Sequence, residues 1–263
     1  MGKLLTGVFI VLALLVMAGY WLSRAEPTPD PKPYLVEPRN IPAPRQPVIQ
    51  RRALKPPEPR VVDNYALSGD LPSLDNSDDR LFDHLRLAVT PIPLGLLNNE
   101  QLLRKFVLQV DNAAKGELIY PHSPLVKPEG ALAVKTTDTE QLYRIDEASY
   151  QRYDSYAELA ETMSISLLVA YYGFYEPLLD SAYAELGYPE NTFRARFITA
   201  IDQALSAPIV EGEVLLKQPE VNFLYADPAL EALNPLQKQF LRMGPENTQR
   251  IQAVLQQFKA RIQ

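Results

Sequence analysis

The chain has 263 residues, with 32 acidic against 26 basic side chains and no cysteine. The lack of cysteine excludes a disulfide framework, a cysteine-ligated zinc site and a lipoprotein anchor. Residues 61–263 hold 28 of the acidic and 17 of the basic residues, a formal excess of 11 negative charges. An acidic domain repels phosphate groups, so the sequence predicts no nucleic-acid partner.

The first predicted element is a membrane anchor. Leu4–Leu22 is uncharged and almost wholly apolar, and a helix of this length spans about 30 Å, the thickness of a bilayer's hydrocarbon core. Tyr20 and Trp21 stand at one end, where aromatic rings favour the headgroup level. A cleaved signal peptide ending near Val16–Ala18 is the alternative, but the apolar run continues past that point. We expect residues 1–24 to form an uncleaved transmembrane anchor.

The orientation of this anchor depends on the short segment before it. A two-residue tail ahead of Lys3 predicts that the amino terminus stays in the cytoplasm and that the globular domain lies in the periplasm. The distribution of positive charge does not support this cleanly, because Arg24, Lys32 and Arg39 follow the apolar run. We expect a single-pass protein of the inner membrane with a periplasmic domain.

Residues 25–60 form a proline-rich linker, with 11 of the 24 prolines and no glycine. Proline fixes φ and removes a donor, so neither helix nor sheet can propagate and an extended spacer is expected. Counted from Arg24, the segment carries eight basic and four acidic residues. Besides a solvated spacer, this pattern is compatible with a strap for anionic lipids or a docking site for a partner.

The domain at 61–263 shows helical periodicity in several segments. In 98–115, apolar residues such as Phe106 and Val110 recur on one stripe. Asn98 is the predicted cap and Gly116 the predicted stop, with Asp111 and Lys115 as an exposed pair.

Tyrosine is concentrated in the middle of the domain, where nine of the 14 tyrosines lie between residues 143 and 188. Tyr150, Tyr153 and Tyr156 are three residues apart, so they share one face if 148–160 is a helix. Tyrosine suits both the edge of a core and an interface, so core packing and a glycan or protein contact surface are the two interpretations.

Further helices follow along the chain. Ile165–Tyr172 is apolar all round, which predicts a buried helix that Gly173 and Pro177 should interrupt or kink. A helix is also expected over 191–205, starting at Asn191.

Two proline-containing pairs mark the last helices. Asp227–Pro228 predicts a cap and first turn, and Gly244–Pro245 predicts the end of one helix and the start of the last. Strands are expected only at 131–136, 141–145 and 213–225. The predicted fold is therefore mainly α, an α-rich α+β domain with a small β element.

Signals for metals and cofactors are weak. His84 and His122 are the only histidines, and neither has a partner three or four residues away, so we expect no zinc or iron. The acids around Ser77 resemble a calcium loop but lack its glycine and distal glutamate, which indicates stabilisation of a helix start. No phosphate-binding loop, dinucleotide fingerprint or serine-nucleophile motif is present, so no cofactor is expected.

One polar cluster stands near the two proline pairs. Two helix starts and an arginine could converge there to hold an anion, or they could serve as caps with a buried Arg–Asp link. The residues are Asn222, Tyr225, Asp227, Arg242, Glu246 and Asn247.

Several short runs resemble the bacterial Domain of Unknown Function 3014 (DUF3014) family over most of residues 70–260. They are Leu74–Asp78, Leu103–Val107, Val110–Asn112, Arg152–Asp154, Pro177–Leu179, Ala182–Tyr183, Leu186–Gly187, Tyr225–Pro228, Leu230–Glu231, Gln237–Gln239, Leu241–Pro245 and Asn247. The resemblance implies a Gram-negative envelope protein with an amino-terminal anchor, and it supplies no activity and no catalytic residues.

These observations favour a tethered envelope protein that binds a protein or cell-wall partner. The candidate binding residues are Arg152, Tyr153, Asp154, Tyr225, Asp227, Arg242 and Asn247. An enzyme acting on envelope glycans or peptides is the alternative, with Asp154, Asp227 and Glu231 as candidate acids that must face one pocket. A third alternative is a purely structural spacer.

Overall fold

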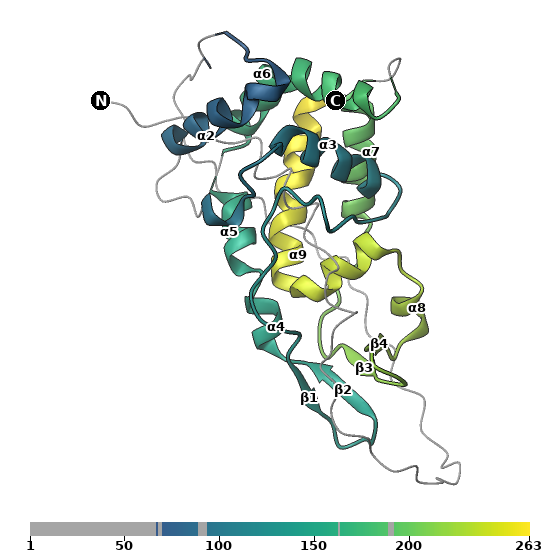
Figure 1. The fold of residues 1–263 in the computed structure, drawn as a ribbon. Helices are drawn as coiled ribbons and strands as arrows, with labels where there is room; N and C mark the ends of the chain where they lie inside the picture. The colour runs from purple at the N-terminus through teal and green to yellow at the C-terminus, as the bar shows by residue number, and fades with distance from the viewer. Residues whose placement is uncertain (1–66, 68–69, 89–93, 163, 189–191) are drawn as a thin grey trace.

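The computed structural model describes residues 67, 70–88, 94–162, 164–188 and 192–263 (Figure 1). The predicted anchor Leu4–Leu22 and the linker 25–60 lie outside these residues. Within the described ranges, no helix is both long and apolar enough to cross a bilayer. This part of the chain is rich in helix and contains a small antiparallel sheet, which confirms the predicted mainly α fold.

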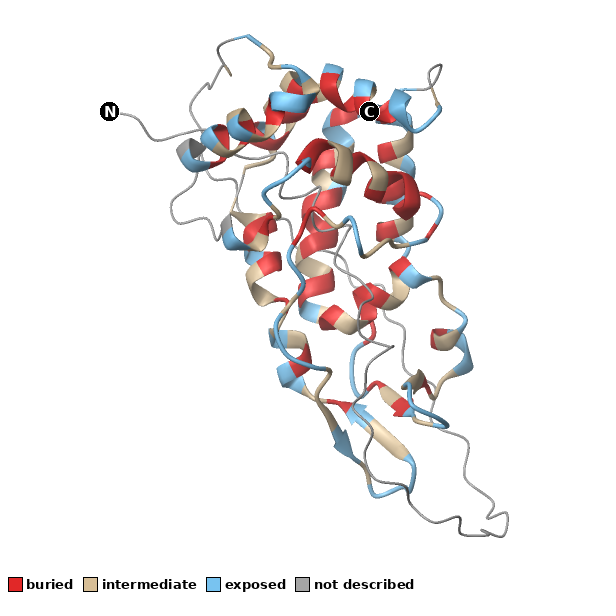
Figure 2. Cartoon of the chain, viewed as in Figure 1, coloured by how far each residue is buried: buried red, intermediate tan, exposed pale blue. Residues whose placement is uncertain are grey.

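The helical part is built around the long helix α9 (Pro235–Ile262), on which the short helix α4 (Glu147–Gln151) and three longer helices pack directly (Figure 1). The three longer helices are α5 (Asp154–Glu161), α6 (Ile165–Glu185) and α7 (Phe193–Leu205). Helix α3 (Leu102–Ala113) packs on α6 and α7, and α2 (Ser77–Ala88) packs on α3. Short 3₁₀ turns at Leu74–Asn76 and Leu94–Leu96 precede α2 and α3. Figure 2 shows that these helices bury one side and expose the other.

Aromatic side chains join three of these helices in one core. Phe106 of α3, Phe193 and Phe197 of α7 and Phe258 of α9 are all fully buried. The ring centroids of Phe106 and Phe193 are 5.4 Å apart, and those of Phe197 and Phe258 are 5.6 Å apart. Such pairs contribute about 0.5–1.5 kcal/mol each beyond the burial of apolar area, so this core fixes how the helices meet.

The small sheet lies at the opposite end of the described chain from α2 and α6 (Figure 1). Its four antiparallel strands follow chain order, with two short helices, α4 (Glu147–Gln151) and α8 (Pro228–Glu231), beside it. The strands are β1 (Val134–Thr136), β2 (Leu142–Ile145), β3 (Leu215–Lys217) and β4 (Leu224–Tyr225). The predicted stretch 213–225 thus contains the hairpin β3–β4, in which Leu216 pairs with Tyr225.

The sheet has a hydrophobic cluster of its own, separate from the helical core. The cluster includes Ile145, Val214 and Leu216 from the sheet side and Leu241 from α9. The preceding residue on α9, Phe240, belongs to the helical core instead. The first part of α9 therefore contributes to both clusters and joins the sheet to the helices.

Two predicted helix starts are wrong by a few residues, because neighbouring helices supply the caps. Helix α3 begins at Leu102, where the carboxylate of Asp78 on α2 accepts bonds from the amides of Gln101 and Leu102. Asn98 instead donates its side-chain amide to backbone carbonyls. Helix α7 begins at Phe193, whose amide donates to Asp180 of α6 at 2.8 Å. The predicted cap Asn191 lies outside the described residues.

The end of α3 agrees with the prediction. Gly116 has a φ of 76°, and its amide donates to the carbonyl of Ala113, which stops the helix. Lys115 pairs with Asp111 at 2.7 Å as expected. The expected exposure of this pair is wrong, because Asp111 is buried and Arg196 of α7 binds the same carboxylate at 2.7 Å.

The predicted interruption of the buried helix is wrong. Helix α6 continues for 21 residues through Gly173 and Pro177. A proline removes the donor for the carbonyl four residues earlier, here that of Gly173. Because Gly173 and Pro177 are both exposed, water can satisfy this carbonyl and the helix is maintained.

The stretch 148–160 forms two helices, α4 and α5, separated by Arg152 and Tyr153. The single helical face expected for the three tyrosines is therefore wrong. Tyr153 and Tyr156 are buried and Tyr150 is half-buried. Most tyrosines of the predicted cluster, including Tyr171 and Tyr175, are buried in the helical core, so core packing accounts for them.

Candidate functional site

A pocket of about 580 Å³ lies where α4 and α5 meet the middle of α9. Its lining combines exposed carboxylates, two side-chain amides, one guanidinium and a few apolar groups. The lining residues are Glu147, Tyr150, Gln151, Asp154, Glu158, Gly212, Met243, Gly244, Pro245, Glu246, Asn247 and Arg250. A concave surface with several convergent polar groups is the default candidate for a binding site.

Two short helices place the carboxylates on one side of the pocket. Asp146 caps α4 by accepting a bond from the amide of Ala148 at 3.0 Å, and Glu147 follows in the first turn. Asp154 begins α5, and Glu158 stands one turn later on the same face. The break between α4 and α5 therefore sets three carboxylates along this wall.

The opposite wall is a kink in α9. Gly244 has φ 81° and ψ 166°, a conformation that is essentially restricted to glycine. A Cβ atom at Gly244 would lie 2.6 Å from Cγ of Tyr150, so the ring also occupies the space that a side chain needs. Pro245 then starts the second part of the helix, which confirms the predicted end and restart.

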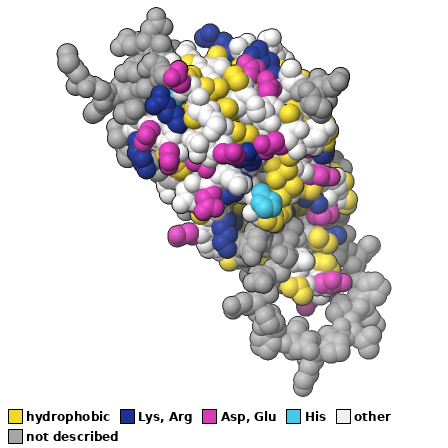
Figure 3. Space-filling model, turned by 45° about the horizontal axis from the view of Figure 1, so that its top comes forward, with side chains coloured by type: hydrophobic (Ala, Val, Ile, Leu, Met, Phe, Trp, Pro, Cys, Tyr) yellow, Lys and Arg dark blue, Asp and Glu magenta, His cyan; other side chains and the backbone are white. Residues whose placement is uncertain are grey.

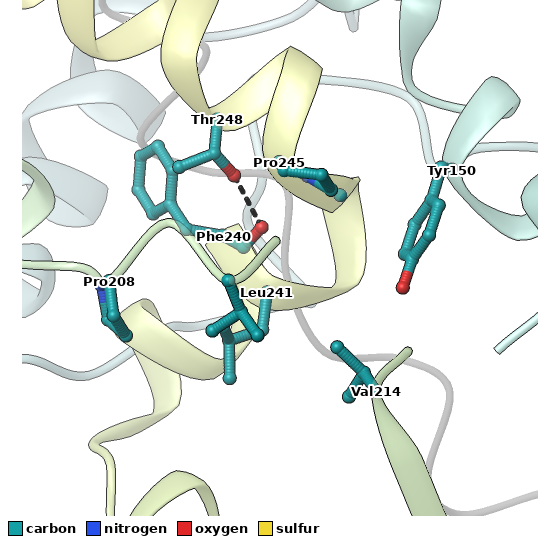
Figure 4. Close-up of a pocket in the computed structure, with 9 residues that line it drawn as sticks. Tyr150, Pro208, Val214, Phe240, Leu241, Pro245 and Thr248 are labelled. Atoms are coloured by element: carbon teal, nitrogen blue, oxygen red, sulfur yellow. Dashed lines mark hydrogen bonds between the residues drawn. The ribbon is translucent and has the colours of Figure 1, made fainter. Parts of the chain in front are cut away.

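Thr248 completes the kink. Its hydroxyl donates to the carbonyl of Phe240 at 2.6 Å, in the buried interior (Figure 4). Pro245 cannot donate to the carbonyl of Leu241, and the Thr248 hydroxyl adds a bond that joins the second part of the helix to the first.

Asn247 ties the two walls together. Its side-chain amide lies within bonding distance of the carbonyls of Tyr150 and Met243, both at 3.1 Å, and of the carboxylate of Asp154 at 2.9 Å. Only 3% of Asn247 is exposed. An amide that bonds α4, α5 and α9 at once fixes the geometry of the pocket.

The electrostatics of the pocket are acidic. Four carboxylates line it, from Glu147, Asp154, Glu158 and Glu246, against one guanidinium. That guanidinium, on Arg250, already pairs with Glu161 at 2.7 Å. Burial lowers the pKa of Arg250, but the bond to Glu161 and the charges of Glu158 and Glu246 outweigh it, so the pKa is raised.

Elsewhere, basic side chains stand among the acidic ones (Figure 3). Figure 3 shows acidic and basic side chains intermingled over one face of the molecule. Arg104, for example, binds both Asp75 and Glu185 at 2.7 Å. The excess of carboxylates in the pocket therefore contrasts with this face.

Tyr150, Gly244 and Pro245 line both this pocket and a second, apolar hollow, which Figure 4 shows. The second hollow has Pro208, Val214 and Leu241 in its lining and is too narrow to admit water. Burial, followed by the influence of Tyr225 and Glu147, raises the pKa of Tyr150 well above its usual range. The Tyr150 ring therefore presents a neutral surface to the pocket.

The predicted binding residues fall into two groups. Asp154 and Asn247 line the pocket. Arg152 and Tyr153 lie in the link between α4 and α5, where the guanidinium is 5.3 Å from the Tyr153 ring and donates to the carbonyls of Ser149 and Gly130. These two residues support the wall of the pocket and do not line it.

The remaining predicted residues lie near the sheet. Asp227 caps α8 by accepting from the amide of Ala229 at 2.8 Å, as predicted. The buried hydroxyl of Tyr225 donates to the carbonyl of Lys238 at 3.2 Å. The expected link between Arg242 and an aspartate is wrong, because in the described part of the chain Arg242 forms no ion pair within 4.0 Å. Of the two helix starts considered for an anion, that of α8 is already occupied by the carboxylate of Asp227.

The three candidate catalytic acids do not share a pocket. Asp154 lines the acidic pocket, whereas Asp227 caps α8. Glu231 accepts from the amide of Tyr225 at 2.8 Å and pairs with Lys238 at 2.5 Å. This trio therefore does not provide the paired carboxyl groups that glycoside hydrolysis uses.

The two histidines have different surroundings. His84 is buried, and its Nδ1 lies 2.7 Å from the hydroxyl of Tyr175. His122 is exposed in a loop. Within the described ranges, no three His, Cys, Asp or Glu residues are grouped so that they could hold a metal ion.

Sequence reasoning did not identify most of the pocket. Glu147, Glu158 and Arg250 carry no local motif, and Tyr150 was noted only as one tyrosine of a series. The signal that could have led to them is Gly244–Pro245, because a predicted kink marks a place where side chains from other elements can approach α9.

The comparisons with known proteins identify a family only. A family model described as a protein of unknown function (DUF3014) matches residues 102–259, which include every residue that lines the pocket. Comparison with curated proteins and with solved structures found no match.

Proposed function

This chain belongs to the DUF3014 family of proteins of unknown function, and from that premise we propose that it is a non-enzymatic binding protein. Its acidic pocket takes a basic segment of a partner protein. The proposal places the domain in the periplasm, held at the inner membrane by Leu4–Leu22 and extended on the linker 25–60. The observation that supports it most directly is the set of four carboxylates around one pocket.

The geometry of these carboxylates suits a cation on a long side chain. Glu147, Glu158 and Glu246 are exposed, so each can reach an incoming ammonium or guanidinium group. Arg250 is held by Glu161 and leaves the other carboxylates to the ligand. Complementary charge raises association rates and discriminates against acidic partners.

The test is a titration of the full-length chain, in detergent micelles, with a fluorescent peptide that alternates arginine and leucine. A pocket variant carries Glu147→Gln, Asp154→Asn, Glu158→Gln and Glu246→Gln. Exposed ion pairs contribute about 0.2–1 kcal/mol each, so the loss of four weakens binding by about tenfold or more. Affinity should also fall with rising salt.

A matched control removes the same number of charges elsewhere. Glu100, Glu129, Glu140 and Glu220 are exposed and do not line the pocket, so their glutamine variants should bind like the parent chain. Equal weakening in both variants would mean non-specific attraction and would contradict the proposal. Cleavage of the peptide during the titration would contradict it in favour of a carboxylate-dependent hydrolase.

A further inference from the structure

The acidic pocket has a second chemical character besides its charge. Tyr150 and Pro245, both half-buried, contribute apolar surface to the same pocket. A ligand that complements the pocket therefore carries positive charges with apolar groups between them, because each type of lining group needs a partner of its own kind.

One segment of this chain has that composition. Residues 38–57 contain no aspartate or glutamate, although Glu37 and Glu58 flank them directly. Five basic residues fall within these 20 positions: Arg39, Arg45, Arg51, Arg52 and Lys55.

Apolar residues stand among these charges. Val48 and Ile49 lie between Arg45 and Arg51, and Leu54 precedes Lys55. The segment thus matches both properties of the pocket, its charge and its apolar surface.

We infer that residues 38–57 dock into the acidic pocket of the same chain and block it, an autoinhibitory contact. The inference rests on the proposed function, because it names the segment that occupies the pocket before a partner does. A partner's basic segment then competes with a tethered one. Docking also shortens the linker between the anchor and the domain.

The chain is long enough for this contact. Leu67 packs against the helical core, which fixes where the described chain begins. The 12 peptide steps from Lys55 to Leu67 span at most about 40 Å. This reach is more than twice the radius of gyration of about 16 Å expected for a compact domain of roughly 200 residues.

Tethering strengthens a weak contact. A segment on a short flexible linker has an effective concentration in the millimolar range. Exposed ion pairs of modest strength are therefore sufficient to keep the pocket occupied within one chain. A segment that docks into another chain does not have this high effective concentration.

The test uses the natural absence of cysteine, which allows a single introduced pair to be followed without competing thiols. Full-length protein in micelles carries Ala53→Cys together with Gln151→Cys, since Gln151 lines the pocket and is exposed. In a control chain, Ala53→Cys is combined with Asp138→Cys in the exposed turn between β1 and β2. Both are oxidised at high dilution, and the rate of the intramolecular disulfide is measured.

We expect the disulfide at position 151 to form at least about tenfold faster than the control, because docking raises the local concentration. Replacing the five basic residues of 38–57 by glutamine should reduce the rate to that of the control. Equal rates in the two chains, or disulfide-linked dimers as the main product, would overturn the inference.

A peptide titration separates this inference from the proposed function. Neutralising the five basic residues should strengthen binding of the arginine–leucine peptide by about tenfold, because the competing segment is removed. Unchanged binding after neutralisation overturns autoinhibition and leaves the pocket as a binding site. Absence of peptide binding even in the neutralised chain overturns the proposed function as well.

Discussion

Helices α6 and α9 each contain a glycine and a proline, yet only in α9 does the glycine leave the helical conformation. In α6, Gly173 keeps the helical conformation, and an added Cβ would have no atom within 4 Å. In α9, Gly244 has a φ of 81°, and an added Cβ would collide with the Tyr150 ring. The residue types are the same, but the proline directly follows the glycine in α9 and comes four residues later in α6, and the surroundings also differ.

The difference shows how packing decides the outcome of a helix-breaking residue. The exposed carbonyl that Pro177 leaves without a donor can bond to water, so α6 tolerates it. In α9 the residues around the bend are buried. The side chains of Thr248 and Asn247 bond to backbone carbonyls there and stabilise the bend. The bend then forms one wall of the pocket.

The largest expected effect is at the bend itself. Gly244→Ala forces an alanine into a glycine-only conformation and against Tyr150, so we expect the free energy of unfolding to fall by about 2–4 kcal/mol. Urea denaturation followed by circular dichroism measures this change. The peptide affinity of the folded fraction should also fall, because the wall of the pocket moves.

Gly173→Ala is the matched control in the helix that does not bend. Alanine favours the helical conformation, and the site has room for its Cβ. We therefore expect the free energy of unfolding to rise by about 0.5–1 kcal/mol. A lower free energy of unfolding for Gly244→Ala together with a higher one for Gly173→Ala would support the comparison. A similar loss of stability at both positions would show that the bend is not determined by the surroundings of Gly244.

The second prediction removes the bond that bridges the bend. Thr248→Val leaves the buried carbonyl of Phe240 without its donor, which should lower the free energy of unfolding by about 1–2 kcal/mol. Thr199→Val in α7 is the control, because its hydroxyl donates to Ala195 at an exposed site where water can replace it. Equal losses in the two variants would indicate a general cost of valine in a helix.

The smallest effect concerns pH and acts where His84 of α2 packs on Tyr175 of α6. Burial first, and then the charge of Arg80, lower the pKa of His84 from its usual 6.5, while Asp83 partly opposes them. The unfolded chain therefore binds a proton more readily than the folded one. Stability is fully present above pH 6.5 and should decrease as pH falls below it.

Thermal unfolding between pH 7.5 and pH 5 checks this dependence. His84→Gln should reduce the slope of stability against pH, whereas His122→Gln, in an exposed loop, should leave it unchanged. An unchanged slope in the His84 variant would assign the pH dependence to other groups.

Local sequence patterns predicted the larger outlines correctly. The family resemblance, the mainly α fold and the restart of α9 at Pro245 are all confirmed. Each depends on features that lie within a few residues of one another, such as apolar periodicity and the glycine–proline pair. The binding residues proposed from the sequence stay a prediction, with Asp154 and Asn247 among those that line the pocket.

By itself, therefore, the sequence determined which segments are helical and where the last helix bends, because backbone stereochemistry is local. Only the tertiary structure decided where α3 and α7 begin, since Asp78 and Asp180 cap them from other helices. It also turned the tyrosines inward and assembled the pocket from residues 147–250. Such contacts join residues distant in the chain, and no local pattern encodes them.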